Sequence, residues 1–174
     1  DFNSNALFVL SSRGVLAYSK NIDKENNLKQ IKNNINEFID LKQFIKNKWF
    51  SIKDIFVSDK QIFVSYTEEI EENCWNTSVI YGDINYEKIN FTKLFSPKTC
   101  VHSYKNIDNE FNATQSGGRI IQLNKNNILL SIGDYRSRHL AQDRQSVNGK
   151  IIKINIIDGK YEIVSMGHRN PQGL

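Results

Sequence analysis

The residues that could do chemistry lie in the last third of the chain, in three short clusters. The first is Gln115–Ile120, in which two adjacent glycines precede an apolar run. The second is Ser131–Asp134, an apolar run that ends in Gly-Asp. The third is Met166–Leu174, which places an arginine, an asparagine and a proline close together.

Each cluster has a structural and a functional interpretation. Paired glycines allow a sharp backbone entry into a crowded place, but they also make simple turns. An acidic residue at a strand end, such as Asp134, can point into a ligand cleft or cap a turn through its own side chain. Arg169 can bind a carboxylate through two parallel hydrogen bonds, and Asn170 can both donate and accept. Spacing alone leaves both interpretations open.

Short antiparallel strands must position these clusters. The recurring unit of the sequence is a hairpin, in which a short polar turn joins two β-rich apolar runs. The expected hairpins pair the following runs: Ala6–Leu10 with Val15–Tyr18, Asp54–Val57 with Ile62–Tyr66, Arg119–Leu123 with Ile128–Ile132, and Lys150–Ile156 with Tyr161–Ser165. Single strands are expected at Thr77–Ile84 and Ile89–Phe95.

Many short strands without intervening helices predict an all-β sandwich, barrel or propeller. The strongest hairpins begin near residues 6, 54 and 119. Two hairpins make a four-stranded propeller blade, and this spacing suits the length of such blades. The sequence therefore predicts about three blades, approximately residues 1–48, 49–112 and 113–174.

The segment Lys24–Lys48 fits this pattern poorly, because its apolar residues fall near helical spacing. Its many asparagines make a poor helix, since their side chains compete for backbone hydrogen bonds. We expect a strand at Phe38–Leu41, and insertion loops or a short helix around it.

Composition narrows the function class. The net charge of +4 is spread along the chain, and no block of basic residues interleaved with aromatics predicts nucleic-acid binding. No apolar run is long enough to span a membrane, and no signal peptide opens the chain. Both ends look cut, so we expect an incomplete chain without activity of its own. Cys74 and Cys100 could form a disulfide or both be free and buried, and they have no metal-ligand spacing.

Several of these runs resemble motifs of the glucose/sorbosone dehydrogenases. Gly167–Leu174 carries the most specific resemblance. Gly117–Ile120, followed at the family's distance by Ile132–Asp134, is similar to two further motifs. Ala141–Ile151 and Trp49–Tyr66 are also similar, so the resemblance covers most of residues 50–174.

The resemblance implies a six-bladed β-propeller, periplasmic or secreted, that binds pyrroloquinoline quinone (PQQ) near its axis with calcium and basic side chains. The family's cofactor-binding pair falls on Arg169 and Asn170, and Asp134 falls on the residue that orients the catalytic base. The calcium ligands would belong to later blades, so no metal ligand is expected here. The family's periplasmic habit is the reason to consider a disulfide between Cys74 and Cys100.

Gln115 departs from the family pattern. The family has a histidine there, four residues before the arginine of the Gly-Gly-Arg motif, which takes the proton of the sugar hydroxyl. Glutamine has no titratable nitrogen, and loss of a general base typically lowers the rate by about two to four orders of magnitude. His102 and His139 are expected in loops, and His168 lies inside the Arg-Asn motif.

Two function hypotheses remain. In the first, the protein is a PQQ-dependent dehydrogenase that oxidises a sugar, aldose or other small polyol, with Gln115 and Asp134 facing the substrate. Asp134 could then act directly as the base if burial raised its pKa. In the second, the protein is a non-catalytic propeller used for binding, and Gln115 marks lost chemistry. A lectin-like sandwich has only the strand pattern in its favour.

Overall fold

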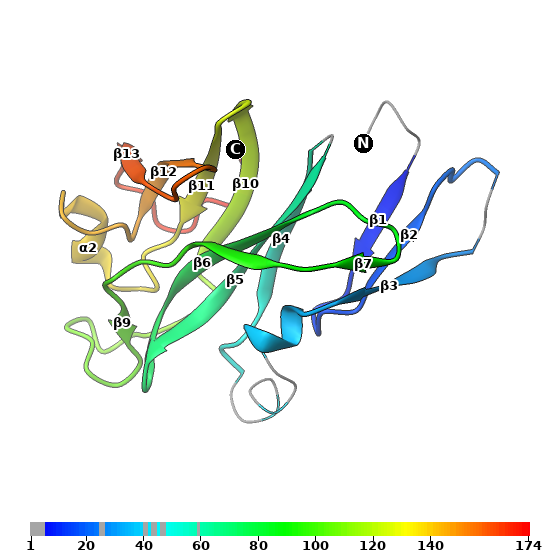
Figure 1. The fold of residues 1–174 in the computed structure, drawn as a ribbon. Coiled ribbons are helices and arrows are strands. Elements are labelled where there is room, and N and C mark those ends of the chain that lie inside the picture. The colour runs from blue at the N-terminus through cyan, green and yellow to red at the C-terminus, as the bar shows by residue number, and fades with distance from the viewer. Residues whose placement is uncertain (1–5, 25–26, 40–41, 43–44, 46–47, 59) are drawn as a thin grey trace.

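The computed structural model describes residues 6–24, 27–39, 42, 45, 48–58 and 60–174. Their secondary structure is almost entirely β-strand, in three sheets that stand side by side (Figure 1). The predicted all-β class and the estimate of three blades are therefore confirmed. The exact blade boundaries stay a prediction.

The first sheet has the strand order β1-β2-β3-β7. Its strands are β1 (Leu7–Leu10), β2 (Leu16–Ser19), β3 (Lys29–Asn33) and β7 (Lys88–Ile89). The predicted first hairpin forms β1 and β2, which pair antiparallel. β7 comes from much later in the chain and pairs parallel to β3.

The second sheet contains the longest strands and lies in the middle (Figure 1). Its strands are β4 (Ile52–Val57), β5 (Gln61–Glu71), β6 (Cys74–Asp83) and β8 (Thr92–Phe95), with β9 (Val101–His102) also paired to β6. The third sheet is a four-stranded antiparallel meander. It consists of β10 (Gly117–Asn124), β11 (Asn127–Ile132), β12 (Lys150–Asn155) and β13 (Tyr161–Met166).

Short helices lie outside the sheets, and the structure describes two of them from end to end. The 3-10 helix η1 (Ile35–Glu37) follows β3, and α2 (Arg138–Gln142) lies between β11 and β12. Lys150, at the start of β12, is fully buried and donates hydrogen bonds to the carbonyl oxygens of Leu140, Ala141 and Asn148. This lysine fixes the end of α2 against the third sheet.

Apolar side chains fill both spaces between the sheets. One core joins the first and second sheets through residues such as Leu16, Ile31 and Trp75. The other joins the second and third sheets through residues such as Phe63 and Leu130. The middle sheet is therefore buried on both faces, which explains why β5 and β6 lack the alternation of buried and exposed residues expected of a half-buried strand.

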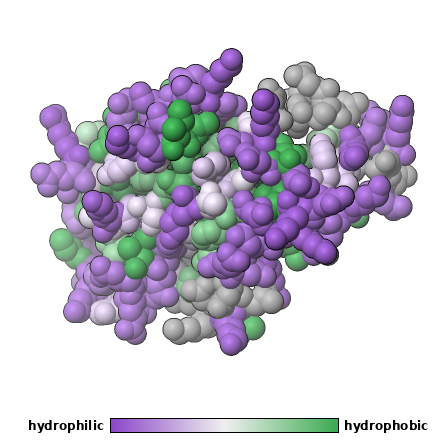
Figure 2. Space-filling view, in the orientation of Figure 1, coloured by the Kyte–Doolittle hydropathy of each residue, from purple (hydrophilic) through white to green (hydrophobic). Residues whose placement is uncertain are grey.

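The third sheet has one less covered side. β12 alternates regularly between buried and half-buried residues, as one covered face requires. Exposed apolar side chains gather on its last strand, β13: Tyr161, Ile163, Val164 and Met166. The face of the molecule in Figure 2 is otherwise mostly hydrophilic.

Two predicted elements need correction, and one strand of the first sheet was not predicted. Ile89–Phe95 is two strands in different sheets, because the side chain of Asn34 interrupts it. The Nδ2 atom of Asn34 donates to the carbonyl of Phe91, and its Oδ1 atom accepts from the amide of Phe91. Phe38 and Ile39 lie in a turn and a bend, so they do not begin a strand, and residues 40–41 lie outside the described residues. β3 was missed because its Lys-Gln-Ile-Lys-Asn sequence has a single apolar residue, Ile31.

Cys74 and Cys100 form a disulfide, which decides between the two states left open by the sequence. Their Cα atoms are 5.3 Å apart, and the bond joins β6 to the segment before β9. No helix among the described residues is long and apolar enough to cross a membrane.

Candidate functional site

The first and second clusters meet through backbone hydrogen bonds. We call residues 112–118 the Gln115 loop. The amide of Tyr135 donates to the carbonyl of Gln115 at 3.1 Å, and the amide of Asn112 donates back to the carbonyl of Tyr135 at 3.1 Å. Gly133 also donates to Ser116 at 2.8 Å. These bonds place Gln115 beside the Gly-Asp end of β11.

The third cluster joins them. The amide of Asp134 donates to the carbonyl of Arg169 at 2.9 Å. The side-chain oxygen of Asn170 accepts a hydrogen bond from the amide of Gly117 at 3.1 Å. The structure therefore brings all four residues predicted from the sequence, Gln115, Asp134, Arg169 and Asn170, to one end of the third sheet, which we call the inner end.

The backbone at this junction is tightly packed and strained. A Cβ atom at Gly133 would lie 2.1 Å from the carbonyl oxygen of Gln115, so only glycine permits this approach. Tyr135 and Arg136, directly after Asp134, have positive φ angles of 54° and 67°. Such left-handed conformations of non-glycine residues are unfavourable, and they concentrate at functional sites.

Side chains of the middle sheet hold the Gln115 loop from the other side. Ser65 on β5 donates to the carbonyl of Gly118, and Thr77 on β6 donates to the carbonyl of Ser116 at 2.9 Å. Lys53 on β4 donates to the carbonyl of Ala113 at 3.1 Å. Bonds to several points of one loop restrict its motion, which is the arrangement that a pre-organised site requires.

Asp134 is buried, with 2 % of its surface exposed. One oxygen of its carboxylate accepts a hydrogen bond from the amide of Arg136 at 2.8 Å. Burial raises the pKa of Asp134, while this hydrogen bond and the positive charges of Arg169 and Arg138 act in the opposite direction. Burial therefore shifts the pKa of Asp134 in the direction that a role as the base would require.

The side chain of Gln115 is not oriented by Asp134, since no hydrogen bond joins the two. Its amide oxygen Oε1 is buried and has no hydrogen-bond partner within the described part of the chain. An unsatisfied buried acceptor typically costs about 1–3 kcal/mol. A ligand hydroxyl that donates to Oε1 would recover this energy, so the position suits a polyol.

The third cluster can recognise an anion. The side chain of Arg169 is exposed. The Oδ1 atom of Asn170 is occupied by Gly117 and by the side-chain amide of Gln172, which leaves its own NH2 group as a donor. A guanidinium beside an amide donor suits a ligand with several carboxylates, such as the quinone. Arg119 has a different role, because it bonds Asp54 and the carbonyl of Gln172.

None of the three histidines lies in the Gln115 loop, where the family resemblance places the base. His168 bonds Ser165 through Nε2 at 2.8 Å. His139 lies on α2, 3.6 Å from a carboxylate oxygen of Asp108, and His102 ends β9, so the expectation that these two are loop residues was wrong. Among the described residues, no three His, Cys, Asp or Glu side chains are grouped to hold a metal ion.

Sequence reasoning missed Lys53 and Tyr135. The hydroxyl of Tyr135 is fully buried and lies 2.8 Å from the hydroxyl of Thr77, so it links the second cluster to the middle sheet. A lysine followed by an aspartate inside the apolar run Ile52–Val57 was the available signal for Lys53.

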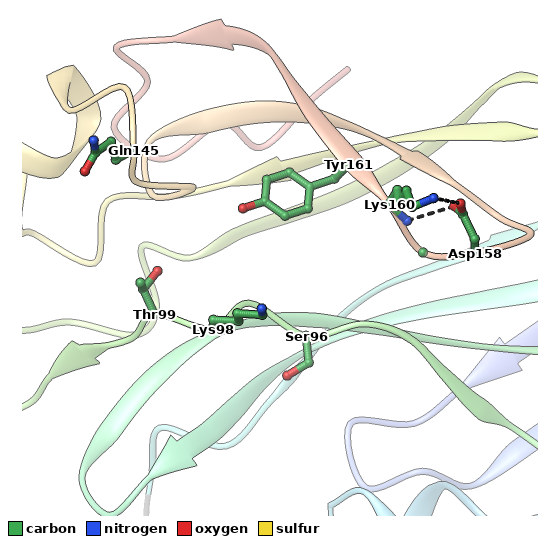
Figure 3. A pocket seen from close by; sticks show the side chains of 8 residues that line it. Ser96, Lys98, Thr99, Gln145, Asp158, Lys160 and Tyr161 are labelled. Carbon is green, nitrogen blue, oxygen red and sulfur yellow. Dashed lines mark hydrogen bonds and ion pairs between the residues drawn. The ribbon is translucent and has the colours of Figure 1, made fainter.

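A second candidate lies at the outer rim, where a groove of about 520 Å³ separates the second and third sheets (Figure 3). Its walls come from the segment after β8 and from the turn between β12 and β13. The groove is lined by Ser96, Lys98, Thr99, Gln145, Asp158, Gly159, Lys160 and Tyr161. None of the four predicted site residues lines it.

Comparison with known proteins identifies the family to which the chain belongs. The sequence model of the family described as Glucose / Sorbosone dehydrogenase matches residues 50–174. Aldose sugar dehydrogenase YliI of Escherichia coli (strain K12) is 25% identical over 132 residues, which cover 68% of this chain and 34% of that protein. The chain thus spans about a third of the length of this curated relative.

Solved structures show the same fold. The soluble aldose sugar dehydrogenase of Escherichia coli in its apo form aligns with a TM-score of 0.65 and 18% identity, over 98% of this chain and 50% of that one. The PQQ-bound aldose sugar dehydrogenase of Streptomyces coelicolor aligns with a TM-score of 0.64 and 16% identity, over 95% and 48%. The three sheets are therefore blades of a β-propeller, the fold that the family resemblance implied. On the match over residues 50–174, this chain belongs to the glucose/sorbosone dehydrogenase family.

Proposed function

We propose that the intact protein is a PQQ-dependent dehydrogenase that oxidises a hydroxyl group of a sugar, aldose or similar small polyol. The observation that carries this proposal is the convergence of Gln115, Asp134 and Arg169, which adjacent backbone hydrogen bonds bring to one end of the third blade. Family membership and the PQQ-bound relative support the choice of cofactor.

The quinone, when bound, supplies the acceptor for the hydride. Arg169 would bind one of its carboxylates through the guanidinium group, and the NH2 group of Asn170 would donate a further hydrogen bond. Calcium is part of the proposal for the intact protein, but we assign it no ligand among the described residues.

Gln115 and Asp134 would face the substrate. Because the Oε1 atom of Gln115 lacks a partner within the described structure, it would accept a hydrogen bond from a sugar hydroxyl and orient the ring. The buried carboxylate of Asp134 would add negative charge near the reacting carbon, which favours departure of a hydride.

One observation favours a second candidate, a propeller that binds its ligands without turnover. Gln115 stands where the family's base is expected, and an amide cannot accept a proton near neutral pH. The two candidates share the same site and differ only in chemistry.

We also propose a periplasmic or secreted location. The disulfide between Cys74 and Cys100 supports it, because disulfides persist in oxidising compartments and are rare in the cytosol of most organisms.

The test is an activity assay of the intact protein with calcium, PQQ, a series of aldoses and a dye as electron acceptor. The proposal expects sugar-dependent reduction of the dye. If PQQ binds but no sugar reduces it, and the Gln115→His variant restores turnover, the natural protein is the binding module of the second candidate.

A further inference from the structure

Lys53 has an unusual position on β4, the strand of the second blade that lies against β10. The register between β4 and β5 shifts between Ile52 and Asp54, so Lys53 sits in a β-bulge. A bulge changes the direction of a side chain, and bulges are frequent next to active sites.

The bulge directs Lys53 along the Gln115 loop. A Cβ atom at Gly118 would lie 2.4 Å from the Cβ of Lys53, so the side chain starts in contact with the end of this loop. Its ammonium group donates to the carbonyl of Ala113 at 3.1 Å, near the start of the loop. The side chain therefore spans the loop that carries Gln115.

The charge of Lys53 is not paired. Among the described residues, no carboxylate lies within ion-pair distance of its Nζ atom. The neighbouring Asp54 is engaged with the guanidinium of Arg119 and with the amide of Ile120. Burial lowers the pKa of Lys53 from 10.5 to about 8.

A structural role alone does not account for a lysine here. Three neutral side chains, Ser65, Thr77 and Asn170, already hold other points of the loop. Lys53 is only partly buried, but even a partly buried cation without a counter-ion is unfavourable, whereas a neutral donor would hold Ala113 at lower cost. Titratable groups in such an arrangement are characteristic of catalytic sites.

We propose that Lys53 is the proton acceptor in the dehydrogenase reaction, the role for which Gln115 lacks a titratable group. This inference rests on the proposed function. The neutral amine has two N–H groups and one lone pair. With one N–H held by the carbonyl of Ala113, the lone pair is oriented and remains available for a substrate hydroxyl.

The reaction balances with the groups already named. The O–H bond of the substrate breaks and its proton passes to the lone pair of Lys53, which becomes an ammonium. The adjacent C–H bond breaks and its electron pair leaves as hydride to the quinone, which is reduced while the carbon is oxidised to a carbonyl. The Oε1 atom of Gln115 accepts a hydrogen bond from a second hydroxyl of the same sugar.

Other titratable groups close to Lys53 are accounted for. Asp54 and Arg119 form an ion pair across β4 and β10. Tyr66 on β5 lies opposite Ile52, and burial together with Glu68 raises its pKa, so it stays neutral over the tested range. The competing base is Asp134, whose pKa is also raised by burial.

The first test compares Lys53→Arg with the wild type in the intact, PQQ-loaded protein from pH 6 to 10. Arginine keeps a donor for Ala113 and the positive charge, but it does not deprotonate. We expect wild-type turnover to rise about tenfold between pH 7 and 9, as a pKa near 8 requires. Lys53→Arg should lose at least about 100-fold. Lys153→Arg, at the ion pair with Glu162 on the third blade, is the matched control and should change nothing.

A second substitution in the Lys53→Arg variant distinguishes a catalytic role of Lys53 from a structural one. Gln115→His should restore turnover to the Lys53→Arg variant, with an activity limb near pH 6–7 typical of histidine. Full activity of Lys53→Arg alone, with an unchanged pH profile, would show that Asp134 or another group is the base.

A second readout does not depend on turnover. In NMR spectra of the protein with 13C-methylated lysines, the Lys53 resonance should titrate near pH 8 and shift on addition of an aldose. A midpoint above pH 10, or no response to any aldose, overturns the role of Lys53. Absence of wild-type turnover with a sugar-responsive Lys53 overturns the proposed dehydrogenase activity instead.

Discussion

The inner end of the third blade and the outer rim groove are both lined by polar residues, but they differ in how these residues are held. At the inner end, Asp134 is buried and the Gln115 loop is bonded to several elements far apart in sequence. At the rim, the ion pair joins Asp158 to Lys160, two residues along the same turn, and the lysine side chain is 86% exposed.

The inner end, unlike the rim, contains energetically unfavourable features that the rest of the fold must offset. Consecutive left-handed residues, a raised carboxyl pKa and an acceptor without a partner in the described structure all occur within the inner end. At the rim, hydrogen bonds from the side chain and the backbone of Lys160 lower the pKa of Asp158, as hydrogen bonds to a charged carboxylate usually do. The rim groove is an open hollow between the second and third sheets (Figure 3). The burial, strain and unsatisfied polar group at the inner end favour that end as the site.

The largest expected effect is at Asp134. Asp134→Asn keeps an acceptor for the amide of Arg136 but removes the negative charge, so we expect sugar oxidation to fall about 100-fold or more. A steady-state assay at saturating aldose measures this loss. Wild-type activity in this variant would contradict the assignment of the inner end as the reaction site.

The same variant should be more stable than the wild type at pH 7. Because the folded pKa of Asp134 is raised, ionisation is penalised in the folded state, and the penalty is fully present above that pKa. The advantage of Asp134→Asn should therefore vanish as the pH falls below the unfolded value, near 3.8. Thermal unfolding of the variant and the wild type at pH 7 and at pH 3 measures the stability difference at each pH. A variant less stable than the wild type at pH 7 would show that ionised Asp134 does not destabilise the folded state.

The next effect concerns the disulfide, which closes the segment that forms one wall of the rim groove. Its sequence separation is 26 residues, so replacing both cysteines by alanine should lower the free energy of unfolding by about 3–4 kcal/mol. PQQ affinity at a temperature where the variant is folded should stay unchanged, since Gln115, Asp134, Arg169 and Asn170 all lie outside the segment between the two cysteines. Loss of PQQ binding in the folded variant would show that rim and inner end are coupled.

A smaller effect is expected where the second and third blades meet at the inner end. Asp54→Ala removes the partner of Arg119 and leaves the amide of Ile120 without its acceptor. We expect a loss of about 2 kcal/mol in urea unfolding. Asp54→Asn is the control and should lose less, because its side chain can still accept from Ile120.

The smallest effect is expected at the rim. Lys160→Met removes an exposed ion pair, which rarely contributes measurable stability, so the unfolding midpoint should move by less than about 2 °C. Turnover should also be unchanged. A tenfold loss of activity in Lys160→Met would show that the rim groove takes part in the reaction, and would contradict the difference between the two regions.

The fold was predictable where apolar runs alternate with polar turns. The hairpins of β1–β2, β10–β11 and β12–β13 were predicted within two residues at every end, because polar turns that carry Asn, Asp or Gly separate their apolar runs. The break between β7 and β8 was not predictable, since it depends on the side chain of Asn34, far away in the sequence.

The candidate site was predictable only through its motifs. Gln115, Asp134, Arg169 and Asn170 were found by resemblance, and the structure supplies the backbone bonds that join them. Lys53 lies in the second blade, and Tyr135 follows Asp134 but contacts Thr77 of the second blade, so both contacts arise from blade packing. No spacing in a single sequence reports such contacts.

The most direct measurement of the central claim is the affinity of the intact protein for PQQ in paired variants. Arg169→Met removes the guanidinium at the inner end, and Lys98→Met removes a comparably exposed cation at the rim groove. The account predicts that Arg169→Met weakens PQQ binding at least tenfold, while Lys98→Met leaves it unchanged. Equal affinities of Arg169→Met and the wild type, or a loss confined to Lys98→Met, would contradict it.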